Sequence, residues 1–198
     1  MDDIRSVIAF CMPITWITLV TRRPAQLRTV PLVAVCLLVS SGLISLIFLQ
    51  SVRVASPSTL LWCMISPVVH ADYLHLCVNL LGGLLVLSRV EEKSGWRQTL
   101  LVVCLSYGLH VFSMALIATV FAKSIYVMGL SSTVYTAIGF FFKENFRYFS
   151  NKEKTSFVPF LVLMLIFDVA IRSIIVHLVA LAFGLAVSSV MSRRQSNP

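Results

Sequence analysis

The sequence predicts an all-α polytopic membrane protein, and two observations predict it: the composition and the placement of charge. Of the 198 residues, 58% are hydrophobic and only 12% are charged, whereas soluble domains are about one quarter charged. The net charge of +8 could indicate nucleic-acid binding, but the Lys and Arg residues occur in short clusters between apolar runs. Such clusters are typical of loops that set membrane topology, so we expect no nucleic-acid partner.

Residues 1–29 are predicted to form an N-terminal apolar segment and a basic linker. Residues 4–20 are apolar but short, and Pro13 interrupts them. This pattern fits either a marginal span or a helix lying in the membrane interface, and the sequence leaves both open. Arg22 and Arg23 follow without a small-residue cleavage site, so we expect no cleaved signal peptide.

Residues 30–194 are predicted to form one membrane domain of six transmembrane helices, followed by a polar tail over residues 195–198. The first apolar run, residues 30–49, has the length needed to cross about 30 Å of hydrocarbon. Residues 50–67 contain prolines and polar residues and predict a long external loop with an amphipathic part that seeks the membrane interface. The remaining spans are expected at residues 68–88, 98–122, 125–142, 157–171 and 173–191, with a charged turn at residues 89–97.

The positive charges of the six-span domain predict its orientation. Most of them fall on one side of the membrane, and only Arg53, Lys123 and Arg172 fall on the other. Cytoplasmic loops are enriched in Lys and Arg, so both ends of the domain are expected on the cytoplasmic side. We therefore expect a multi-pass protein in the lipid bilayer of a bacterial cytoplasmic membrane; its oligomeric state stays open.

Four polar residues are expected at similar depth inside the membrane. Counted from the basic residue that ends each span, a helical rise of about 1.5 Å per residue places Ser131 roughly 18 Å, His177 roughly 24 Å, Asn79 roughly 15 Å and His75 roughly 21 Å from the cytoplasmic boundary. Polar residues are costly inside a bilayer, so an aligned set indicates a functional site.

Helical spacing brings these residues onto common faces. His75 and Asn79 are four residues apart, as are Ser131 and Tyr135, and this spacing leaves side chains about 40° apart around a helix. A fourth helix that begins near Ser131 would leave residues 124–130 as irregular backbone, which is tolerated at that depth only beside protein or a water-filled cavity.

Nucleophilic acyl transfer is the chemistry that this set predicts. A serine hydroxyl needs a base to take its proton, and a neutral histidine is suited to that role. Asn79, His75 and the backbone N–H of Ser131 are available as donors to an oxyanion. No acidic residue is placed to complete a triad, so we predict a dyad of Ser131 and His177.

These residues resemble the rhomboid intramembrane serine proteases. His70, His75 and Asn79 are similar to that family's H-x4-H-x3-N pattern, and Gly129-Leu130-Ser131 is similar to the start of its G-x-S-G motif.

The resemblance extends to the fourth and last spans and covers residues 30–194. Tyr135 stands where many members have a tyrosine that packs on the catalytic histidine, and His177 with Gly184 resembles the histidine and glycine of the last span. Ser132 replaces the second glycine of the motif, Ala180 replaces a glycine of the last helix, and Trp62-Cys63 stands where many members have tryptophan-arginine.

The resemblance implies a rhomboid-like six-helix bundle that opens to the non-cytoplasmic side. Ser131 would be the nucleophile, His177 the general base, and His75 with Asn79 the oxyanion site, while His70 would support the loop or water access. Substrates would be membrane-anchored proteins cleaved in or near a transmembrane segment, without a metal or an organic cofactor.

Other interpretations stay open beside this one. A catalytically inactive relative that binds transmembrane clients would carry the same fold, and a small transporter could use His75 and Asn79 to bind an ion. Ser132 is an alternative nucleophile, but it points about 100° away from Ser131 on a helix. His110 has no motif partner and is expected to be structural. Asp168 and Arg172 are spaced for a local ion pair.

Overall fold

The structure is a computed structural model, and it describes residues 60–68, 70, 73–121, 129–148, 150–152, 154–155 and 174–196. In this part of the chain every regular element is a helix and no strand occurs. Several predicted features lie outside the described residues: the apolar runs at 4–20, 30–49 and 157–171, the ion pair of Asp168 with Arg172, and residues 122–128 before the candidate nucleophile.

The region predicted as a long loop with an amphipathic part contains a short helix and a 3-10 helix, so the expectation of a loop was wrong for residues 60–67. Helix α3 spans Leu60–Ile65, and the 3-10 helix η1 spans Ser66–Val68. Pro67 was interpreted as a helix breaker, and α3 ends at Ile65, just before it, where η1 begins. The ring of a proline and its missing N–H disfavour the continuation of an α-helix.

Helices α4 (Tyr73–Ser94) and α5 (Trp96–Phe121) form a hairpin. The predicted charged turn over residues 89–97 is reduced to Gly95, whose φ of 82° is a conformation that favours glycine. Arg89 and Glu92 pair at 3.0 Å along α4. Charged side chains mark where the apolar part of a span ends, but Arg, Glu and Lys are good helix formers, and so the helix continues past it.

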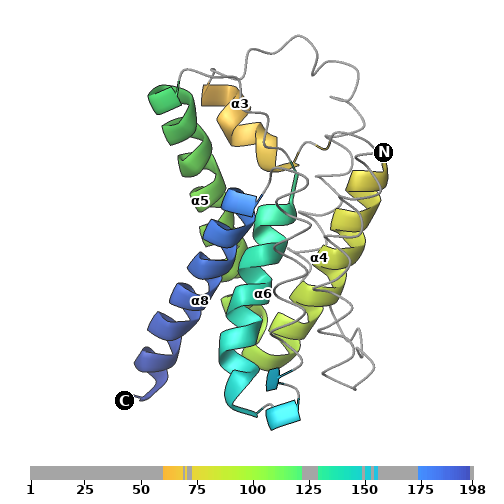
Figure 1. The fold of residues 1–198 in the computed structure, drawn as a ribbon, viewed down its shortest axis with the longest axis vertical. Coiled ribbons are helices and arrows are strands. Elements are labelled where there is room, and N and C mark those ends of the chain that lie inside the picture. Colours follow the sequence, from red (N-terminus) through yellow and green to blue (C-terminus); the bar gives the residue numbers. More distant parts are fainter. Residues whose placement is uncertain are drawn as a thin grey trace.

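Helix α6 (Ser131–Asn145) lies at the centre of the described bundle, with α5 and α8 on one side of it and α4 on the other (Figure 1). Nearly all of its residues are buried. The helix begins at Ser131, which agrees with the alternative in which the fourth helix starts near that residue and not at residue 125. A 3-10 helix, η2 (Phe146–Tyr148), follows it.

Helix α8 (Ile174–Ser196) packs closely on α6. It runs five residues beyond the predicted end of the last span, through two arginines, for the same reason that α4 outlasts its apolar part. Gly139 and Gly184 allow the contact: a Cβ at Gly139 would overlap the carbonyl oxygen of Leu181, and one at Gly184 would overlap that of Thr136. Small residues at such crossings let helix backbones approach in membrane proteins.

The buried core joins α4, α5, α6 and α8, and its side chains are apolar. By length and composition, Trp96–Leu116 of α5 could cross a membrane, whereas Ile175–Met191 of α8 is a shorter apolar helix. The core residues are Val86, Leu87, Val90, Val102, Val103, Val134, Tyr135, Ala137, Ile138, Phe140, Phe141, Ala180 and Val187.

Candidate active site

Ser131 is the first residue of α6 and directly follows a tight turn. The turn contains Gly129, whose φ of 101° is strained for any residue with a side chain. The N–H of Gly129 donates to the carbonyl oxygen of Ser66 at 2.9 Å, and the N–H of Leu130 donates to Nε2 of His70 at 3.3 Å. The turn before Ser131 is therefore held by the segment that contains η1.

His177 of α8 lies next to Ser131. Its Nε2 is 3.3 Å from Oγ of Ser131, and both residues are buried, with 7% of each exposed. The ring of Tyr135 stacks on the imidazole with a centroid distance of 4.1 Å and an interplanar angle of 8°. The two helices thus bring the imidazole of His177 into contact with a hydroxyl and with an aromatic ring. Ser131 and His177 are 46 residues apart in sequence.

The close approach of α6 and α8 explains this contact. Ser131, Tyr135 and Gly139 are spaced by four residues and share one face of α6. On α8, Gly184 follows His177 by seven residues, which is two helical turns and leaves both on one face. The glycines bring the two helix backbones together, and the residues one or two turns above them meet as a result.

The other predicted site residues divide into three cases. His70 is 1% exposed and accepts the Leu130 N–H, so it supports the turn before Ser131. Asn79 is buried in α4, which packs on α6. His75 lies one turn before Asn79 in α4, and its side chain is outside the part of the chain that the structure describes.

His110 does have hydrogen-bonding partners, which the sequence interpretation missed. Its Nδ1 lies 2.8 Å from Oγ of Ser132, and its Nε2 lies 3.1 Å from Oγ of Ser66. The 100° angle between Ser131 and Ser132 on α6 was the available signal, because it directs Ser132 toward a different helix from its neighbour. The partner on that helix and the Ser66 contact depend on tertiary packing, which no spacing in the sequence reveals.

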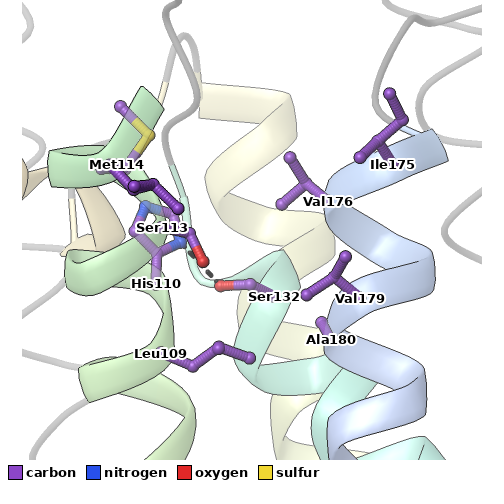
Figure 2. A pocket seen from close by; sticks show the side chains of 10 residues that line it. Leu109, His110, Ser113, Met114, Ser132, Ile175, Val176, Val179 and Ala180 are labelled. Atoms are coloured by element: carbon purple, nitrogen blue, oxygen red, sulfur yellow. Dashed lines mark hydrogen bonds between the residues drawn. The ribbon is translucent and has the colours of Figure 1, made fainter. Parts of the chain in front are cut away.

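Ser132, His110 and Ala180 border a cavity of about 250 Å³ between α5, α6 and α8. Figure 2 shows the His110–Ser132 hydrogen bond at its edge and the aliphatic side chains of α8 facing it. Ala180, which replaces a family glycine, is 1% exposed and part of the core, so its methyl group is accommodated at this level of α8.

Serine and histidine in contact, with a helix N-terminus beside them, can support nucleophilic attack on a carbonyl carbon. The N–H of Ser131 belongs to the first turn of α6 and has no acceptor within its own helix. The positive end of the helix dipole favours negative charge at this place. The arrangement therefore suits a reaction in which an oxyanion develops near Ser131.

Comparison with known proteins identifies the family. The family model described as Rhomboid domain matches residues 57–194, which is more than half of the chain. No curated protein and no solved structure matches the sequence. The match covers the helices from α3 to α8, except the last two residues of α8, and every predicted site residue. The chain belongs to the rhomboid family and is an integral membrane protein.

Proposed function

We propose that this protein is an intramembrane serine endopeptidase that cleaves membrane-anchored proteins in or near their transmembrane segments. Ser131 is the nucleophile and His177 the general base. The observation that carries the proposal is the buried contact of 3.3 Å between Oγ of Ser131 and Nε2 of His177, with Tyr135 stacked on the imidazole. Catalytic hydrogen bonds are often long in a free enzyme and tighten when substrate binds.

The first half of the reaction forms an acyl-enzyme. Nε2 of a neutral His177 takes the proton of Ser131 while Oγ attacks the carbonyl carbon of the scissile peptide bond. The carbonyl oxygen becomes an oxyanion, and the C–N bond then breaks as the protonated His177 gives the proton to the leaving amine.

In the second half, His177 takes a proton from a water molecule that attacks the ester carbon. The C–O bond to Ser131 breaks, the proton returns to Oγ, and the new carboxyl end of the substrate leaves. The stacked Tyr135 ring fixes the plane of the imidazole through both halves, because a ring 4.1 Å away at 8° leaves it little room to rotate. The dyad needs no metal and no organic cofactor.

The oxyanion is stabilised by Asn79, His75 and the N–H of Ser131. The position of Ser131 at the start of α6 supports this role for its amide, and the burial of Asn79 in α4 supports a function for a polar group that is costly to bury.

We also infer six transmembrane helices with both ends of the domain in the cytoplasm. The charge distribution supports this orientation. In this orientation the loop between the third and fourth spans would lie on the opposite side of a bacterial cytoplasmic membrane, and the turn at Gly129 would lie nearer to that side.

Labelling with a fluorophosphonate serine probe tests the dyad. Purified protein should be labelled, Ser131→Ala and His177→Ala should not, and the same variants should fail to cleave a reporter protein with one transmembrane segment. Size-exclusion profiles that match wild type show that the variants are folded. Folded wild-type protein that neither labels nor cleaves the reporter would favour an inactive relative that binds transmembrane clients.

A further inference from the structure

A second serine–histidine pair lies on the other side of the α6 N-terminus from His177. Ser132 contacts His110 of α5, and His110 contacts Ser66 of η1. All three residues are buried. α6 is therefore bound by α8 through Ser131 and by α5 through the neighbouring Ser132.

The hydrogens in this chain can be assigned from its last contact. Oγ of Ser66 donates its one proton to the carbonyl oxygen of Cys63 at 3.3 Å. Nε2 of His110 must then donate to Oγ of Ser66, which leaves Nδ1 as an acceptor for the hydroxyl proton of Ser132. In this arrangement each donor and each acceptor of the Ser132, His110 and Ser66 side chains has a hydrogen-bond partner.

The chain closes on the turn before the proposed nucleophile. Ser66, which receives the His110 N–H on its side chain, accepts the N–H of Gly129 on its carbonyl oxygen at 2.9 Å. Contacts therefore run from Ser132 through His110 and Ser66 to Gly129. These hydrogen bonds connect the residues on both sides of Ser131, and so they fix where the Oγ and the N–H of Ser131 lie.

We infer that His110 is a positioning residue for Ser131, an inference that rests on the proposed function. The cavity of about 250 Å³ beside Ser132 means that packing leaves one side of the first turn of α6 unsupported (Figure 2). The hydrogen bond from Ser132 to His110 restrains it there instead. A displacement of about 1 Å can lower an enzyme rate about a hundredfold, so a loss of this restraint affects turnover.

Ser106 provides the matched control. It lies one turn before His110 on the same face of α5, is 1% exposed, and its Oγ lies 3.0 Å from Oγ1 of Thr133. Ser106→Ala therefore removes a buried hydrogen bond between the same two helices, α5 and α6, that does not pass through η1.

Three substitutions of His110 separate its two contacts. His110→Phe keeps a ring and removes both hydrogen bonds. His110→Asn carries an amide at the δ position and can keep the bond to Ser132, whereas His110→Gln carries one at the ε position and can keep the bond to Ser66. We measure the fluorophosphonate labelling rate, kcat and KM for the transmembrane reporter, and hydrogen exchange of the peptide that covers residues 129–132.

We expect His110→Phe to lower the labelling rate and kcat about tenfold to a hundredfold, with KM changed less than about threefold. His110→Asn and His110→Gln should fall between it and wild type. Amide exchange at residues 129–132 should become faster in His110→Phe and stay unchanged in Ser106→Ala, which should also keep its kcat. The double variant His110→Phe/Ser132→Ala should be no slower than His110→Phe, because both changes break the same chain.

Other results overturn the inference. If folded His110→Phe keeps the kcat and the amide exchange of wild type, the hydrogen bonds of His110 do not position Ser131. If Ser106→Ala loses as much kcat as His110→Phe, the effect is a general one of helix packing. Labelling that survives Ser131→Ala and is lost in Ser132→Ala would make Ser132 the nucleophile. If wild type neither labels nor cleaves, the proposed protease function fails, and the exchange data alone decide whether His110 holds the turn.

Discussion

Gly184→Ala should disrupt the active site without touching any of its residues. A Cβ there would overlap the carbonyl oxygen of Thr136 and lie 2.8 Å from the backbone N of Phe140. Carbon atoms pack best at about 3.5–4.0 Å, so the contact with Phe140 alone is at least about 0.7 Å too short. Both neighbours are backbone atoms of α6 and cannot rotate away, so the helices must separate.

The size of the effect follows from this overlap. Overpacking of this kind costs about 1–3 kcal/mol of stability. Because Gly184 and His177 share one face of α8, a separation of the order of 1 Å moves the imidazole away from Ser131, and the expected loss of kcat is about a hundredfold.

Gly108→Ala is the matched control, since it makes the same chemical change inside α5 with nothing within 4 Å of the added Cβ. It should leave activity unchanged and add about 0.5–1 kcal/mol, the usual gain of alanine over glycine in a helix. The free energies of unfolding of the two variants should thus differ by about 1.5–4 kcal/mol, measured by denaturant titration in micelles. Equal stability and activity in the two variants would refute the close α6–α8 contact.

Two further predictions concern the dyad and the oxyanion. Tyr135→Phe should keep most of the activity because the ring that stacks on His177 is retained, whereas Tyr135→Leu should lower kcat about twofold to tenfold, the effect of roughly 0.5–1.5 kcal/mol of lost stacking; equal kcat in both variants would contradict the role of the ring. Asn79→Ala and His75→Ala should each lower kcat about a hundredfold to a thousandfold while KM changes little, and unchanged turnover of the transmembrane reporter in both would contradict their assignment to the oxyanion site.

The sequence was a good guide to the existence of helices and a poor guide to their ends. Apolar runs predicted the spans that became α4, α5, α6 and α8, because hydrophobicity decides which segments enter the membrane. The predicted ends were wrong by up to six residues at the C-terminal end of α4, where the helix continues to Ser94. Charge marks the boundary of the bilayer, whereas helix ends are set by residues such as Gly95 that stop the backbone.

The candidate site could be predicted only where its residues follow a known pattern. Ser131, Tyr135 and His177 were selected by spacing, depth and family resemblance, and these residues meet in the structure. His110 was missed because its two partners lie 22 and 44 residues away on other elements. A lone histidine in an apolar run gives no period and no motif, so only packing reveals its contacts.

Ser132 illustrates how a departure from a motif can be accommodated. In the sequence it stands in place of the second glycine of the family's motif. In the structure its hydroxyl is hydrogen-bonded to Nδ1 of His110, and Nε2 of the same imidazole is hydrogen-bonded to Oγ of Ser66. A glycine at this position would leave Nδ1 of His110, a buried acceptor, without a donor, which carries a desolvation cost of about 1–3 kcal/mol. The serine and the histidine therefore satisfy each other, and the missing glycine is weak support for an inactive protein.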